Sequence, residues 1–289
     1  SRELLQSDKV VDKIRSSCVK RVLKMLTKMS KNNKEKYSKF WKNFGAVLKE
    51  GAIEDFSNKE DISDLLRFHS TRVDSDEQSV SFDDYLSRMQ PEQENIYYLI
   101  ADNYQAAKSS PLLEVFRKKD IEVLLLTDHV DEWLVGHLMN YKSKNLVSIA
   151  SGELEEKLEK SEENDKQAES SKQDFADIVK KMKEILQDSV KDVRITHRLT
   201  DSPSCIVHDK TDMSPHMQRI MQAAGQQVPV AKPILELNPQ HDFLIRIKEQ
   251  SDDNTLEDWS YVLFGQAMIL EGEDLSNPAD FIGRLNRLL

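Results

Sequence analysis

The chain is poor in cysteine, glycine, proline and aromatic residues, and each shortage narrows the classes of fold open to it. Its 289 residues include 2 Cys, 8 Gly and 8 Pro, and 7% are aromatic. Cys18 and Cys205 lie far apart without Cys/His spacing typical of zinc, so we expect neither a disulfide framework nor a zinc site. With 32% charged residues, the composition favours long solvated helices over β-sandwiches. A reducing cytoplasmic location is expected.

Long apolar runs and catalytic motifs are missing as well. No stretch approaches the roughly 18 apolar residues of a membrane span, and no signal peptide is visible, which predicts a soluble protein without a membrane partner. G-x-S-x-G, P-loop, H-E-x-x-H and G-x-G-x-x-G motifs are absent. His197 and His208 are interpreted as satisfied surface or core residues, and no metal site is predicted. Residues alone give no support for catalysis. Because the first residue is not Met, we expect a fragment or a processed chain.

Charge is unevenly distributed along the sequence. The net charge is −10, yet residues 1–50 hold 14 Lys and Arg against 5 Asp and Glu. Phe40, Trp41 and Phe44 lie among these lysines, which poses the question of nucleic-acid binding. Their spacing is typical of a helix core, however, and RNP, KH and zinc-finger signatures are absent. A solvated helix face or a protein-docking patch is favoured, and nucleic acid is not expected as a partner.

Apolar periodicity predicts a mixed α+β and α/β fold. Helices are expected over 8–29, 33–48, 58–68 and 82–89, as a helical coil covering 1–90. Strands over 96–100, 121–126 and 146–149 then alternate with helices over 104–119 and 130–141, which indicates a small three-layer α/β unit over 91–152 with a parallel sheet. These parts form a first domain, 1–160. Residues 153–172 are almost entirely polar and predict an exposed linker or arm. A second α+β domain, 173–289, ends in a helix pair.

A short methionine-rich helix is expected between strand-like segments in the second domain. Met213, Met217, Ile220 and Met221, named here the Met stripe, recur at helical spacing and share one side with Ala224. Two interpretations stay open. Apolar residues at this spacing usually belong to the core, but flexible, polarizable methionine also suits surfaces that accept varied apolar chains. The opposite face, with His216, Gln218, Arg219 and Gln222, is expected to be solvated.

The last 35 residues predict two apolar helices. Thr255 with Asp258 resembles a capping box, and Asn277 and Pro278 suit the N-cap and first position of the final helix. Such a pair commonly completes its core with the same pair from a second copy, although it could instead fold back on its own domain. Gly265 could permit close approach. The predicted dimer interface comprises Trp259, Leu263, Phe264, Leu270, Phe281, Ile282, Leu285 and Leu289.

Several longer motifs resemble the heat-shock protein 90 family of chaperones, and its bacterial branch most closely. They include Ser1-Arg2-Glu3, Phe40-Trp41, the segments 97–102 and 193–200, Asp131-Glu132-Trp133, and Leu235-Glu236-Leu237-Asn238-Pro239. The resemblance covers the whole chain. It implies the later part of a middle domain followed by the whole C-terminal domain, without the N-terminal ATP-binding domain.

The resemblance also implies roles for individual residues. Arg2 would contact the γ-phosphate and Gln6 would support its loop, only in a full-length protein that uses ATP and magnesium; the fragment itself would hold no cofactor. Trp133 and the Met stripe (Met213, Met217, Ile220, Met221) would contact unfolded or partly folded clients. A homodimer and a seventy-kilodalton-class chaperone are the implied partners, the latter on a basic surface at Lys20, Arg21 and Lys24. A purely structural dimerisation scaffold stays open as the alternative.

Overall fold

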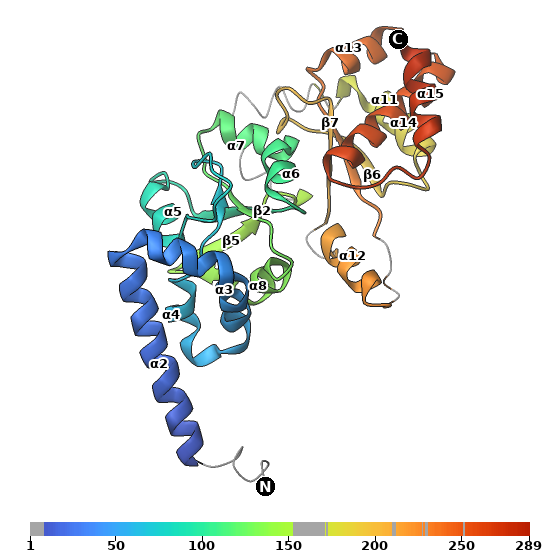
Figure 1. The fold of residues 1–289 in the computed structure, drawn as a ribbon. Helices are drawn as coiled ribbons and strands as arrows, with labels where there is room; N and C mark the ends of the chain where they lie inside the picture. The colour runs from blue at the N-terminus through green and yellow to red at the C-terminus, as the bar shows by residue number, and fades with distance from the viewer. Residues whose placement is uncertain are drawn as a thin grey trace. The chain divides into compact units, whose positions relative to one another are not determined.

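The structure, a computed structural model, describes residues 9–152, 171, 173–209, 212–226, 228, 231–250 and 252–289 (Figure 1). The chain divides into two compact units. The first comprises Ser1–Ile96 with Asp128–Leu146, and the second Tyr97–Thr127 with Val147–Leu289. Helices and two small sheets confirm the predicted mixed fold. The units do not follow the expected boundary at 153–172, most of which lies outside the described residues, so that boundary stays a prediction.

The first unit is mainly helical, as expected. Its longest helices, α2 (Lys9–Asn32) and α3 (Lys34–Glu54), are separated by Asn33, whose side chain accepts a hydrogen bond from the Lys36 backbone N–H at 3.0 Å. This contact caps α3. The helix predicted over 58–68 is too long. The observed helix ends at Ser63, and Phe68 instead pairs with Val80 in an antiparallel bridge. The remaining elements are η1 (Phe56–Asn58), α4 (Lys59–Ser63), β1 (His69–Ser70), α5 (Phe82–Arg88), α8 (Asp131–His137) and β4 (Asn140–Tyr141).

The helix predicted over 130–141 is wrong in its last residues. Helix α8 ends at His137, and β4 pairs antiparallel with β5 (Lys144–Ser148) through Tyr141 and Lys144. Lys142 and Ser143 form the turn with φ of 44° and 68°. Left-handed backbone at both central residues produces the twist of a two-residue hairpin, and neither residue is the glycine or asparagine that signals such a turn in a sequence.

Two strands whose paired residues belong to the second unit are parallel, as predicted. Strand β2 (Asn95–Ile100) pairs with β3 (Leu124–Leu126), with Tyr98 opposite Leu124. The single helix predicted over 104–119 is wrong. It is broken at Ser110, which is extended (φ −63°, ψ 131°) because it precedes Pro111. The connection consists of α6 (Tyr104–Ser109), η2 (Pro111–Leu113) and α7 (Glu114–Lys118).

A three-stranded sheet supports the rest of the second unit. Its order is β6-β8-β7, with β8 (Ile234–Leu237) parallel to β6 (Asp192–Ile195) and antiparallel to β7 (Ser204–Val207). Leu235 and Leu237 of the central strand pack with Trp259 and Leu263 in one buried cluster. The helices are α11 (Ala176–Ile185), α12 (Pro215–Ala223), α13 (Asp242–Gln250), α14 (Asp253–Leu270) and α15 (Pro278–Leu288). Within the described part of the chain, none of the helices has the length and apolar character needed to cross a membrane.

Helices α14 and α15 pack closely in the same chain. The predicted cap of α15 is confirmed, because Asn277 Oδ1 accepts from the Asp280 N–H at 3.1 Å, with Pro278 next in sequence. The capping box proposed at Thr255 is wrong. Asp252 is the N-cap of α14, and its side chain accepts from the Thr255 N–H at 2.7 Å.

Arginine side chains of α15 bind an aspartate of α14 and hold the two helices together. Arg287 donates to both carboxylate oxygens of Asp258 at 2.7 Å, and Arg284 donates to the same carboxylate at 2.9 Å. These hydrogen bonds lower the pKa of Asp258. At Gly265, a Cβ atom would lie only 2.6 Å from Phe281 Cδ2, so the close approach depends on this glycine.

Gly265→Ala is expected to lower the free energy of unfolding by about 1 to 3 kcal/mol, because the Phe281 ring must move out of a packed position. Gly283→Ala is the matched control on α15. Its Cβ would meet Arg287 Nη1 at an ordinary 3.8 Å, and helix propensity predicts a gain of up to about 1 kcal/mol. Urea unfolding of both variants checks this, and an equal effect of the two substitutions would contradict the packing account.

Candidate functional site

Helix α12 forms where the methionine periodicity predicts it. Ser214 is the N-cap, and its side chain accepts from the Met217 N–H at 3.0 Å. Pro215 occupies the first helical position, where its missing N–H costs no hydrogen bond. Gly225 follows the helix with φ of 79°, a left-handed conformation typical of a helix end.

The polar face of α12 is turned toward the unit, and the expectation that it is solvated holds for only part of it. His216 and Gln218 are buried, contrary to that expectation, whereas Arg219 is half-buried and Gln222 is exposed. His216 Nδ1 lies 2.9 Å from Asp102 Oδ1, and Arg219 Nη2 lies 2.7 Å from the same oxygen. Arg219 also pairs with Glu273. Burial alone would raise the pKa of Asp102, but the hydrogen bond from His216 and the charge of Arg219 outweigh it and lower that pKa.

Because its polar face holds α12 to the unit, the Met stripe is left on the other side. Met217, Ile220 and Met221 belong to α12, whereas Met213 precedes the N-cap and lies outside the helix, contrary to the prediction. All four side chains are half-buried. None of them belongs to the two clusters of buried apolar side chains described in this unit. The interpretation of these residues as ordinary core is therefore less favoured than that of a partly open apolar ledge.

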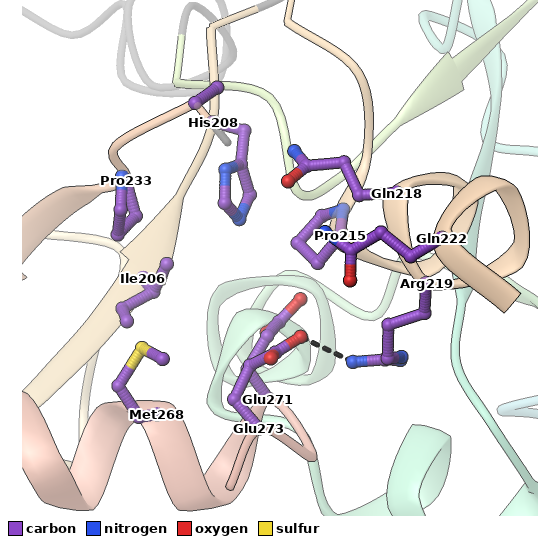
Figure 2. Close-up of a pocket in the computed structure, with 11 residues that line it drawn as sticks. Ile206, His208, Pro215, Gln218, Arg219, Gln222, Pro233, Met268, Glu271 and Glu273 are labelled. Carbon is purple, nitrogen blue, oxygen red and sulfur yellow. Dashed lines mark hydrogen bonds and ion pairs between the residues drawn. The ribbon is translucent and has the colours of Figure 1, made fainter. Parts of the chain in front are cut away.

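A pocket of about 280 Å³ lies on the inward side of α12 (Figure 2). Helix α12 provides one wall, β7 and the segment before β8 provide a second, and the end of α14 provides the third. The lining residues are Ile206, His208, Pro215, Gln218, Arg219, Gln222, Ala231, Pro233, Met268, Glu271 and Glu273. All of them belong to the second unit.

Two titratable side chains in this pocket have perturbed pKa values. Burial lowers the pKa of His208, against the charges of Asp212 and Asp209, so the ring is neutral at pH 7. Burial, followed by the charge of Glu273, raises the pKa of Glu271 to about 8. Across the described residues, neither ring nitrogen of His208 has a hydrogen-bond partner. The described residues therefore do not support the interpretation of His208 as a satisfied histidine.

Trp133 lies in the first unit on α8 and is 38% exposed. The helix begins at Asp131, whose fully buried carboxylate lies 2.8 Å from Nζ of the equally buried Lys49. Lys49 also pairs with Asp128 at 2.8 Å. Burial raises the pKa of Asp131, and Lys49 opposes this shift. At the other end of the helix, Lys59 Nζ donates to the His137 carbonyl at 2.6 Å.

The predicted dimer residues divide into buried and exposed groups. Trp259 and Leu263 are 4% and 0% exposed inside the core of their own unit, so they offer no surface to a second copy, and the prediction is corrected for these two. Phe264, Phe281 and Leu285 are half-buried. Apolar surface remains at Ile269, Leu270, Ile282 and Leu289, of which Ile282 is 51% and Leu289 95% exposed.

Arg2 and Gln6 lie outside the described residues, and their implied roles stay predictions. In the described part of the chain, no group of three or more His, Cys, Asp or Glu side chains could hold a metal ion. Sequence reasoning missed Asp102, Glu271 and Lys49. Only Lys49 left a signal, since it continues the buried helical spacing of Trp41 and Gly45, where a lysine requires an internal partner.

Comparisons with known proteins agree on one family. The family described as Hsp90 protein matches residues 1–289. The chain is 55% identical to the chaperone protein HtpG of Coxiella burnetii (strain RSA 331 / Henzerling II) and 54% identical to HtpG of Legionella pneumophila (strain Paris). HtpG of Psychromonas ingrahamii is 50% identical. Each match covers 100% of this chain and 46% of the relative, so the chain spans about half the length of these relatives.

Lys49→Met should lower the free energy of unfolding by about 3 to 5 kcal/mol, because it leaves the Asp131 carboxylate buried without its cation. Lys39→Met in the same helix is the control. Its partner Glu35 and Lys39 itself are largely exposed, so less than about 0.5 kcal/mol should change. Unfolding followed by tryptophan fluorescence measures both variants. Similar losses in the two would rule out the ion pairs of Lys49 as the anchor of α8.

Proposed function

The chain belongs to the Hsp90 protein family, and on that premise we propose that it is the part of a molecular chaperone that binds partly folded client polypeptides and pairs with a second copy of itself. The observation that carries this proposal is the orientation of α12. A helix whose buried side is polar and whose half-open side is the Met stripe has its apolar face available for another chain.

Client binding suits the chemistry of the stripe. Methionine side chains have several rotatable bonds and a polarizable sulfur, so they adapt to apolar surfaces of different shape. Each well-buried contact would contribute roughly 1 to 2 kcal/mol, and several together give useful affinity without demanding one client sequence. Trp133 is a second contact of the same kind, on a helix fixed by the Lys49 ion pairs.

Dimerisation is supported by the apolar surface left on the terminal helix pair. Ile269, Leu270, Ile282 and Leu289 stay exposed after α14 and α15 have packed together. A symmetric interface would bury this surface against the same surface of a second copy. The proposed interface would also include the half-buried side chains of Phe264, Phe281 and Leu285.

The full-length protein would use ATP and magnesium, with Arg2 contacting the γ-phosphate and Gln6 supporting its loop. The 289-residue chain would bind clients without hydrolysing ATP itself. Lys20, Arg21 and Lys24 are exposed on α2 and form the proposed surface for a seventy-kilodalton-class chaperone. A cytoplasmic location fits these roles.

Met217→Asp is expected to weaken the binding of a fluorescently labelled, unfolded model client at least tenfold, because it introduces a charge into the Met stripe; tenfold corresponds to about 1.4 kcal/mol. Fluorescence anisotropy measures the affinity. Met139→Asp is the control, since Met139 is 68% exposed but lies outside the stripe, and it should leave affinity unchanged.

Sedimentation equilibrium separates client binding from dimerisation in the same set of proteins. The unmodified chain and Met217→Asp should show about twice the chain mass of 33.4 kDa, whereas Ile282→Asp should show a single chain that still binds the client. A dimer that binds the client equally well with and without Met217→Asp would refute the Met stripe as the client surface. A dimer that binds no client at all would identify a structural scaffold.

A further inference from the structure

The pocket behind α12 contains a buried polar group whose hydrogen-bonding capacity is unused. The His208 side chain is 9% exposed and faces the pocket (Figure 2). Its backbone is fixed on both sides, with its N–H donating to the Ala150 carbonyl and its carbonyl accepting from the Gly152 N–H. Both ring nitrogens lack partners in the described part of the chain. Leaving such a group unsatisfied is unfavourable, and a ligand with a hydrogen-bond donor would satisfy it.

The pocket also has more carboxylates than cations. Of its lining residues, Glu271 and Glu273 carry carboxylates and Arg219 carries the guanidinium. Arg219 is already shared between Glu273 and Asp102. Among the residues that the structure describes, the Glu271 carboxylate takes part in no hydrogen bond or ion pair. With a pKa of about 8, Glu271 is mostly protonated at pH 7 in the empty pocket. A cation that enters the pocket favours the ionised carboxylate, so it would meet an anion without another cation and a neutral ring nitrogen together.

The remaining walls suit the hydrocarbon part of a long cationic group. Ile206, Pro215 and Pro233 line the space between His208 and the acids, and Met268 lies below them (Figure 2). Lysine and arginine side chains bury their methylene stems along apolar surface while keeping the charged head with polar partners. A bare metal ion is a poor occupant, because the described residues offer no cluster of ligands for one.

We propose that this pocket binds the arginine or lysine side chain of a client polypeptide, with Glu271 as the anionic partner and His208 as a hydrogen-bond acceptor. The proposal rests on the proposed function and adds to it a preference for clients with a basic residue beside an apolar segment. Pro215, Gln218 and Gln222 of the pocket belong to the helix that carries Met217, Ile220 and Met221 on its other side, so a client chain that passes around this short helix could meet both surfaces.

Two labelled peptides that differ in a single charge test this preference. One places arginine beside an apolar segment, and the other has neutral citrulline, which keeps the shape, at the same position. We expect the unmodified chain to bind the arginine peptide about tenfold more tightly, because the difference is one charge-assisted pair. Glu271→Gln should reduce that ratio to within about twofold, with the affinity for the citrulline peptide unchanged.

A charge-matched variant excludes general attraction by the acidic chain. Glu184 on α11 is exposed and is absent from the pocket lining, so Glu184→Gln removes the same charge elsewhere and should keep the tenfold ratio. A ratio that falls equally in Glu184→Gln and Glu271→Gln would overturn the pocket proposal. Equal binding of the two peptides to the unmodified chain would also overturn the pocket proposal. That result would not contradict the proposal that the chain binds clients.

Two further measurements distinguish the pocket proposal from client binding in general and from the binding of a free organic cation. Met217→Asp should weaken both peptides together and leave their ratio at about tenfold. Failure of the unmodified chain to bind either peptide would overturn the proposed function and the pocket assignment with it. Agmatine supplies the same guanidinium without a polypeptide. Calorimetry should show that it binds much more weakly than the arginine peptide, and equal affinity would assign the pocket to a free organic cation instead.

Discussion

The ion pairs that hold the polar face of α12 inward are the constraint on which the rest of the site depends. An amphipathic helix of a globular domain normally buries its apolar side. Here Asp102, which follows β2, accepts from His216 and Arg219, and Arg219 also reaches Glu273 beyond the end of α14. The pairs are partly exposed and individually modest. Their main effect is on the orientation of α12. Asp102 and Glu273, which are far apart in sequence, bind the polar face and so determine which side of the helix carries the Met stripe.

The same constraint accounts for the pocket. Placing a polar helix face against the unit brings carboxylates and a histidine into a partly apolar space, and Arg219 serves two acids at once. Among the described residues Glu271 has no cation paired with it, and burial with Glu273 nearby raises its pKa to about 8. Helix α8 in the first unit follows a related rule, because Lys49 and Asp131 are buried at its start while Trp133 stays 38% exposed. In both places internal charges position apolar side chains at the surface.

Local sequence signals predicted much of the fold. Periodicity located α2, α12 and the parallel pair β2 and β3, and Asn277 with Pro278 located the start of α15. Periodicity could not decide which face of α12 is buried, because that depends on Asp102, more than a hundred residues away. The dimer prediction counted Trp259 and Leu263 as interface, since an all-apolar helix does not reveal how much of it the local sheet and helices cover. Ion pairs between residues distant in sequence, including that of Lys49 with Asp131, could hardly be predicted from the sequence.

The oxidation rate of individual methionines in dilute hydrogen peroxide, followed by peptide mass spectrometry, tests the orientation of α12 most directly, because the sulfoxide forms where sulfur is accessible. Met139, 68% exposed, and Met182, fully buried, provide the two reference rates within the same chain. The account predicts that Met217 and Met221 oxidise at least tenfold faster than Met182 and that an excess of unfolded client slows them. Rates as low as that of Met182 in the free chain would contradict it.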